Sequence, residues 1–177
     1  MPTSFAATVD LLAARVQMFS ALLDKVEGQW AGRDLAALGE VRLAPDMHPL
    51  GWQFGAVALQ ARLFAAWCRD EAMANSVPEQ TGWNEGREVL RLAQRELEDI
   101  RSLGVMPEAK RIEIGMIGMY LDLTGQRYVD DWLLPNLYFH ITTAYAIMRM
   151  QGAELGKADF LSNLLPELRP MEPEVPA

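Results

Sequence analysis

The stretch WLLPNLYFHITTAYAIMRMQGAELGKADFL, residues Trp132–Leu161, decides how this chain is expected to fold. Its apolar residues recur every three or four positions, as they do on the inner face of a packed helix. This inner stripe comprises Leu133, Leu137, Ala144 and Met148, with Ile141 and Tyr145 at its edge. The spacing predicts a long helix that begins with Thr124 as its N-terminal cap and runs toward Gly152, a residue suited to ending a helix.

Two residues inside this helix depart from its regular pattern. Pro135 has no backbone N–H and its ring clashes with the preceding turn, so we expect a kink or a break into two pieces there. His140 lies three residues after Leu137 and four before Ala144, so its side chain is expected to point inward with theirs. The predicted helix therefore carries an imidazole on its apolar side.

The chain begins with another predicted helix, from about Ser4 to Val26, whose apolar residues alternate steps of three and four. Thr3 or Ser4 is expected to cap its beginning, because a hydroxyl can accept a hydrogen bond from a free backbone N–H of the first turn. Gly28 is expected to end it. A polar connection rich in Gly and Ala follows.

A second helix is expected after Pro45 and Pro49, which belong before or within a first helical turn. Asp46 is its predicted N-terminal cap, since a carboxylate suits the positive end of a helix. The inward residues are Leu50, Phe54, Val57, Ala61, Phe64 and Cys68. Gln53 falls within this stripe, and an amide on an inward face requires a hydrogen-bond partner.

The third predicted helix has Thr81 as its N-terminal cap and ends near Gly104. Its inward residues are Leu90, Ala93, Leu97 and Ile100. Between Lys110 and Leu123 the apolar residues recur mostly at every second position, which predicts two short strands or an extended excursion.

The whole chain fits one domain. It has 177 residues, of which 50% are hydrophobic and 23% charged, as in ordinary globular proteins. We expect an all-α, up-down four-helix bundle over residues 1–162, with a long crossover between the third and fourth helices that includes a short β-hairpin. Residues 163–177 form a proline-rich, acidic tail, expected to be extended or disordered unless a partner holds it.

Charge and cysteine content exclude several classes of function. The net charge is −8 and the basic residues are scattered, which argues against nucleic-acid binding. The single cysteine, Cys68, excludes an intramolecular disulfide and a cysteine-rich zinc site, and its place on an apolar stripe predicts a buried, inert thiol. No unbroken apolar run reaches the roughly 20 residues that span a membrane, and the first residues lack the basic region of a signal peptide. We therefore expect a cytoplasmic protein that binds neither nucleic acid nor membranes.

Two long, irregular motifs resemble those of an uncharacterised family with a domain of unknown function. The first is RLAPDMHPLGWQ, residues 42–53, and the second is LPNLYFHITTAYAIMRMQGAELGKADFL, residues 134–161. The resemblance covers almost the whole chain up to Leu161. The family it points to belongs to the DinB/YfiT-like superfamily of four-helix bundles. The resemblance implies a DinB-like fold, and it carries no assigned function.

The wider superfamily implies a metal site that this sequence fills incompletely. Many DinB-like proteins hold a divalent metal with three histidines, one from the second helix and two, four residues apart, from the last long helix. His140 matches the first of that pair, but Ala144 stands where the second is expected. Gln53 is the inward polar residue of the second helix, and an amide is a poor ligand for zinc or nickel. His48 and His140 remain weak candidate ligands, and we expect no metal cofactor.

Each polar candidate has a functional and a structural interpretation. His140 is either a ligand, a general base or a substrate hydrogen-bond partner, or else a core histidine bonded to Gln53, to Asp46 or to a backbone carbonyl. Asp46, Gln53, His140 and Tyr145 are predicted to line one small-molecule pocket between the second and last helices. The alternative is a hydrogen-bond network that specifies how these helices pack. His48 is expected at a partly exposed helix start.

Three hypotheses of function follow. The first is a helical bundle that binds a small molecule without the usual three-histidine metal site. The second, implied by the resemblance, is a metal-dependent transferase or isomerase that uses a small thiol. The third is a purely structural dimerisation domain. A homodimer is expected in each case, because every helix carries more apolar surface than one bundle stripe needs.

Overall fold

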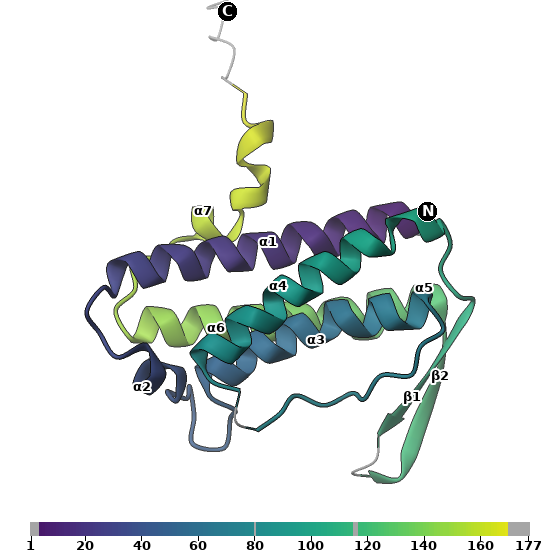
Figure 1. Ribbon diagram of the computed structural model, residues 1–177, viewed down its shortest axis with the longest axis horizontal. Coiled ribbons are helices and arrows are strands. Elements are labelled where there is room, and N and C mark those ends of the chain that lie inside the picture. The colour runs from purple at the N-terminus through teal and green to yellow at the C-terminus, as the bar shows by residue number, and fades with distance from the viewer. Residues whose placement is uncertain (1–3, 80, 115–116, 170–177) are drawn as a thin grey trace, which may run out of the picture.

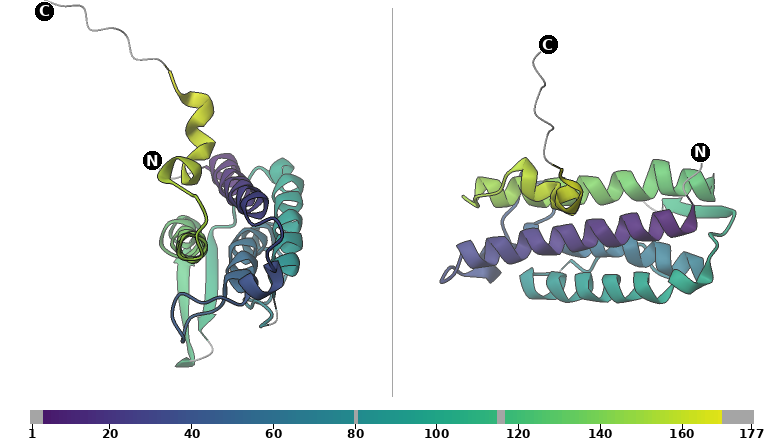
Figure 2. Two further views of the ribbon diagram at one scale, coloured as in Figure 1. Left: turned by 90° about the vertical axis from the view of Figure 1, so that its left-hand side faces the viewer. Right: turned by 90° about the horizontal axis from the view of Figure 1, so that it is seen from above.

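The computed structural model describes residues 4–79, 81–114 and 117–169 (Figure 1). Four long helices dominate it, and Figure 2 shows them lying alongside one another in a bundle. They are α1 (Phe5–Gln29), α3 (Leu50–Cys68), α4 (Trp83–Asp99) and α6 (Leu134–Met150). Three short helices, α2 (Leu35–Gly39), α5 (Gly125–Arg127) and α7 (Lys157–Phe160), connect or follow them. The predicted all-α four-helix bundle is confirmed.

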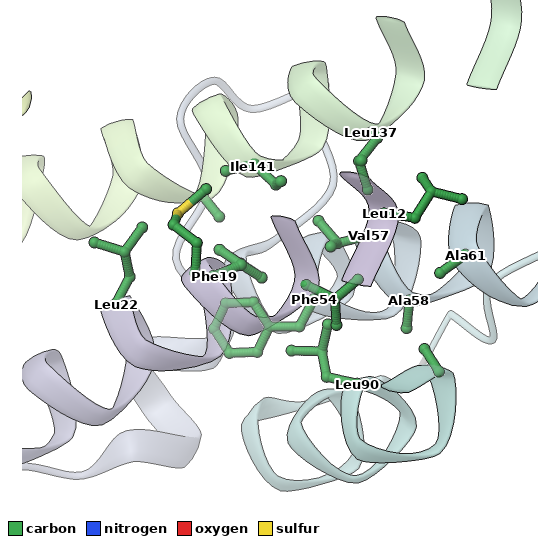
Figure 3. Packing of buried hydrophobic residues seen from close by; sticks show 14 of the residues in the cluster. Leu12, Phe19, Leu22, Phe54, Val57, Ala58, Ala61, Leu90, Leu137 and Ile141 are labelled. Atoms are coloured by element: carbon green, nitrogen blue, oxygen red, sulfur yellow. The ribbon is translucent and has the colours of Figure 1, made fainter. Parts of the chain in front are cut away.

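The core of the bundle is formed by the predicted apolar stripes. Phe19 of α1 packs edge-on against Phe54 of α3, with ring centroids 5.6 Å apart. Figure 3 shows Leu90 of α4 and Ile141 of α6 converging on the same interior. All four side chains are buried, at 1% exposure or less, so the three- and four-residue spacing located the core correctly.

Helix α1 begins as predicted but ends later. The Ser4 hydroxyl accepts a hydrogen bond from the N–H of Ala7, which makes Ser4 the N-terminal cap. The prediction that Gly28 ends the helix is wrong, because the helix continues to Gln29. The residue that takes a left-handed conformation is Gly32, with φ of +86°. By length and composition this helix is also apolar enough to cross a membrane, although charged residues interrupt its apolar run. Its apolar face is packed inside the bundle, as in a core helix.

Two predicted caps are wrong. Asp46 is exposed in the loop before α3, and Pro49 occupies the cap position without a side-chain hydrogen bond. Leu50 instead donates its N–H to the carbonyl of Val41, so a long-range backbone contact sets where the helix begins. Likewise Thr81 donates its hydroxyl to the carbonyl of Pro78, and Gly82 precedes α4. An unpredicted helix, α2, takes the carboxylate cap, from Asp34.

Helices α3 and α4 cross at a contact made by glycine. A Cβ atom added to Gly51 would lie 2.6 Å from the carbonyl carbon of Gly82. A Cβ added to Gly86 would lie 2.7 Å from the Cβ of Phe54 and 2.9 Å from the carbonyl oxygen of Gly51. The two backbones therefore approach to a separation that side chains would prevent.

The last long helix contains a widened turn before its proline. Thr124 caps α5 by accepting a hydrogen bond from the N–H of Arg127, as predicted. The chain then forms a π-helical segment, Tyr128–Leu133, in which the N–H of Leu134 reaches back to the carbonyl of Val129. Pro135 follows in the first turn of α6. The expected break is thus a change of helix type, which moves backbone carbonyls away from the proline ring.

The crossover between α4 and α6 is a β-hairpin, as predicted. Strand β1 (Ala109–Ile114) pairs antiparallel with β2 (Met119–Thr124), in a register that places Ala109 opposite Thr124. Figure 1 shows the hairpin extending away from one end of the bundle. Ile112 and Leu123 are buried and anchor it to the core. Gly115, predicted to interrupt the strands, lies outside the described residues.

The C-terminal segment leaves the bundle beside α1. An ion pair of 2.7 Å between Lys25 and Asp159 holds α7 against α1. A 3-10 helix, Ser162–Glu167, then projects outward, as Figure 2 shows. The prediction of an extended or disordered tail is therefore wrong for this part, and residues 170–177 lie outside the described residues. The helix leaves Leu164, Leu165 and Leu168 exposed.

Candidate ligand site between α3 and α6

The site begins with a hydrogen bond between a buried amide and an imidazole. Gln53 of α3 is 2% exposed, and its Oε1 lies 2.8 Å from Nδ1 of His140 on α6. Its Nε2 donates to the backbone carbonyl of His48, at 3.0 Å. Both ends of the Gln53 amide are therefore satisfied, which meets the requirement for a buried polar group. The predicted pairing of His140 with Gln53 is the one that occurs.

This pairing fixes which imidazole nitrogen carries the proton. A backbone carbonyl can only accept, so the Gln53 atom facing His48 is the Nε2 donor. The opposite atom, Oε1, is then an acceptor, and Nδ1 of His140 must donate to it. In the neutral ring the lone pair consequently belongs to Nε2. Among the described residues this nitrogen has no hydrogen-bond partner.

The protonation state of His140 is set mainly by burial. Burial lowers the pKa of the imidazole to about 4, and the nearby His48 contributes in the same direction. A ring with this pKa is neutral at pH 7. His140 therefore presents an uncharged acceptor with a fixed tautomer.

An aromatic cluster, His48–Trp52–His140, covers one side of the imidazole. Trp52 meets His140 edge-on, with centroids 5.6 Å apart. On its other side Trp52 stacks with His48 at 3.8 Å and an interplanar angle of 11°. The indole thus separates the only two histidines of the chain, and His48 is exposed rather than part of the interior.

A cavity of about 150 Å³ lies beside His140, between α3, the start of α6 and the loop that follows α3. Its wall is formed by Trp52, Ala56, Leu59, Gln60, Asn75, Ser76, Val77, Trp132, Asn136 and His140. Asn136 donates from Nδ2 to the carbonyl of Trp132, at 2.7 Å. Gln60 is 5% exposed, and its buried Oε1 has no hydrogen-bond partner among the described residues. The wall contains no charged residue, so the site is polar but neutral.

The structure brings together two of the four predicted pocket residues. Gln53 and His140 are bonded, whereas Asp46 lies exposed in the loop before α3. Tyr145 donates its hydroxyl to the carbonyl of Leu155 at 3.3 Å and packs edge-on against Phe160. Tyr145 therefore fixes the C-terminal turn. Of the four predicted pocket residues, only His140 is among the residues of the cavity wall, and Gln53 lies behind it as its hydrogen-bond partner.

Sequence reasoning missed Gln60 and Asn136. Gln60 lies seven residues after Gln53, and Asn136 four before His140, so each repeats a polar position one or two turns along the same helix face. A lone amide within an apolar stripe was the signal that singled out Gln53. The same signal, applied to Gln60, would have located the cavity.

The residues at this site do not fit the metal that DinB-like relatives imply. The position four residues after His140 is Ala144, which is fully buried. Gln53 uses its amide oxygen for His140, and the His48 ring is stacked on Trp52. Across residues 4–79, 81–114 and 117–169, no group of three or more His, Cys, Asp or Glu side chains is placed to hold a metal ion.

Cys68 lies apart from the site, at the end of α3. It is half-buried, and burial raises the pKa of its thiol to about 12 against the smaller opposing effect of Arg69. The thiol is therefore protonated at pH 7 and unsuited to nucleophilic attack.

Comparison with known proteins places this bundle in a family. The family model described as "Domain of unknown function (DUF1993)" matches residues 5–161, which include both motifs and all four long helices. The chain belongs to that family. Its structure is also similar to the crystal structure of a DinB family member from Shewanella denitrificans, with a TM-score of 0.71 and 28% sequence identity. That similarity covers 95% of this chain and 93% of the other. Among curated proteins none matches this chain.

Proposed function

We propose that this protein binds a small, uncharged part of a ligand in the cavity beside His140. The observation that carries the proposal is the buried Oε1 of Gln60, a residue of the cavity wall, which has no hydrogen-bond partner in the part of the chain that the structure describes. A buried amide oxygen without a hydrogen-bond partner lowers the stability of the folded protein by about 1–3 kcal/mol. A ligand that donates a hydrogen bond to this region offsets that cost.

The polarity of the wall limits the chemistry of the ligand. His140 offers the Nε2 lone pair, and Asn136 retains its amide oxygen after donating to Trp132. Trp52 and Trp132 supply flat apolar surface for stacking. This combination favours a neutral, planar group with N–H or O–H donors. A charged group would lose hydration without an opposite charge in the wall.

The proposed role is binding, and His140 acts as a hydrogen-bond acceptor in it. A general base works best when its pKa lies near the operating pH. The pKa of His140, lowered by burial to about 4, makes the imidazole a weak base at pH 7. Its fixed tautomer is an advantage for recognition, since the acceptor is already oriented before the ligand arrives.

The test is a crystallographic and NMR screen of a library of neutral aromatic amides against the full chain. Fragments are expected in the cavity, with chemical-shift changes at His140 Nε2. Their affinity should fall about tenfold in His140→Ala, which removes one hydrogen bond and the adjoining contacts. Tyr145→Phe is the matched control, because it removes a hydrogen bond outside the cavity. Fragments that bind equally well to His140→Ala would overturn the proposal.

We also propose that two copies of the chain associate in solution. Support comes from exposed apolar residues on α6 and in the C-terminal segment. Phe139 and Met150 are 57% and 51% exposed on α6, and Leu168 after the C-terminal 3-10 helix is 70% exposed. Light scattering coupled to size-exclusion chromatography is expected to give twice the chain mass. A single chain mass would contradict this.

A further inference from the structure

A second hollow adjoins the cavity beside His140. It is a groove of about 530 Å³ between the β-hairpin and the loop after α3. Its wall is formed by Leu63, Met73, Ala74, Asn75, Lys110, Arg111, Ile112, Glu113, Tyr128 and Trp132. Asn75 and Trp132 line both the groove and the cavity, so the two spaces share a wall. The cavity and the groove are therefore neighbours.

Lys110 is the available cation of this groove. It lies on the bundle side of β1, half-buried, with Nζ 5.9 Å from the centre of the Tyr128 ring. In the described parts of the chain its ammonium forms no ion pair, although the protein carries 24 acidic residues. Burial lowers its pKa, the expected response of a cation that loses water without gaining a carboxylate.

The two other charged residues of the groove do not neutralise Lys110. Arg111 and Glu113 alternate with Lys110 along β1, and both are exposed on the opposite side of the strand. Arg111 is engaged with Asp122 on β2 through two hydrogen bonds, of 2.8 and 3.0 Å. The positive charge that remains inside the groove is that of Lys110.

Tyr128 adds a neutral donor to the same wall. Its side chain is 2% exposed, and its hydroxyl has no hydrogen-bond partner within the described residues. Burial raises the pKa of this phenol, so the hydroxyl stays protonated and able to donate at pH 7. An ammonium and a hydroxyl that both lack acceptors suit an oxyanion.

We propose that the groove binds a carboxylate or phosphate group through Lys110 and Tyr128, and that this group belongs to the ligand whose neutral part occupies the cavity beside His140. The second half of this inference rests on the proposed function. The ligand class is then a planar hydrogen-bond donor joined to an acidic group. The shared wall of Asn75 and Trp132 lies between the two ends.

Hippurate and its neutral amide, hippuramide, test this pairing, because they differ only in the terminal carboxylate. In calorimetric titrations hippurate is expected to bind about tenfold more tightly than hippuramide, the value of one charged hydrogen bond. Lys110→Gln should abolish the difference. Lys157→Gln, which removes the same charge from the exposed surface of α7, should retain it. Competition by inorganic phosphate but not by acetate would identify the acidic group as a phosphate.

The outcomes separate the two proposals. Equal affinity for the two compounds, with both weakened by His140→Ala, would overturn the anion site and leave the cavity function standing. A preference for hippurate that depends on Lys110 but not on His140 would support the anion site and overturn the shared ligand. A preference that survives Lys110→Gln, or no binding of either compound at millimolar concentration, would overturn the inference.

Discussion

Helix α3 meets its two main neighbours through faces of opposite character. Toward α4 it presents Gly51, which approaches Gly82 so closely that even a methyl group has no room. Toward α6 it presents Gln53 and Gln60, a hydrogen bond to an imidazole, and a cavity of about 150 Å³. Dense packing on one face secures the helix pair, and this leaves the other face free to carry polar groups that cost stability.

A methyl group added at the crossing of α3 and α4 is expected to cause the largest loss of stability. Gly51→Ala and Gly86→Ala are each expected to lower the free energy of unfolding by about 2 kcal/mol, because backbone must move to admit the new Cβ. The higher helix propensity of alanine offsets only part of this. Urea denaturation of the two variants measures the change.

Gly28→Ala is the matched control for these variants. No atom lies within 4 Å of the position its Cβ would take, near the end of α1. Alanine there is expected to raise stability, by about 0.5–1 kcal/mol. A similar loss in all three variants would show that the crossing is not specially tight.

Lowering the pH is expected to destabilise the protein by protonating His140, which packs between α6 and α3. The pKa of this histidine is about 4 in the folded protein, below its ordinary value of 6.5, so the unfolded chain binds more protons between those values. Stability therefore falls as the pH drops from 6.5 to 4, by an amount on the order of 2 kcal/mol. His140→Gln should flatten this part of the pH dependence, measured by urea denaturation at each pH. An unchanged slope would contradict the burial of a neutral imidazole.

Gln53→Leu tests the contribution of the α3–α6 hydrogen bond, because it removes the amide that holds His140. It leaves the Nδ1 proton of His140 and the carbonyl of His48 without their partner, so a loss of about 1–2 kcal/mol is expected. A shift of the His140 tautomer mixture, read from imidazole nitrogen chemical shifts, should accompany it. A variant as stable as the parent, with the same tautomer, would show that Gln53 does not orient the ring.

Gln60→Leu is expected to have the smallest effect, and in the opposite direction. It replaces an amide whose Oε1 is unpaired with an apolar group, so stability should rise by up to about 1 kcal/mol. Binding of neutral fragments should weaken in the same variant. A clear loss of stability would indicate that Gln60 has a structural partner and would remove the main support for the cavity as a ligand site.

The sequence predicted what depends on the spacing of residues within one helix or strand. The apolar stripes, the hairpin and the inward direction of Gln53 and His140 all follow from local periodicity. It failed where distant backbone decides the outcome. Asp46 is not a cap because Leu50 bonds to Val41, and Tyr145 is not part of the cavity wall because its hydroxyl bonds to Leu155 of the returning chain. The cavity itself depends on the loop after α3, whose path no periodic pattern records.

The π-helical segment before Pro135 has a consequence for comparing related sequences. A turn closed by bonds to the fifth residue back contains one residue more than an α turn, so it is equivalent to a single-residue insertion in a continuous helix. Deleting one residue between Tyr128 and Leu133 would close this wide turn to an ordinary α turn, with the chain on either side kept in register. Relatives with a one-residue gap before the proline should therefore place a different side chain at the position of Trp132, which lines both the cavity and the groove. Such a gap would mark a change in what the site accepts.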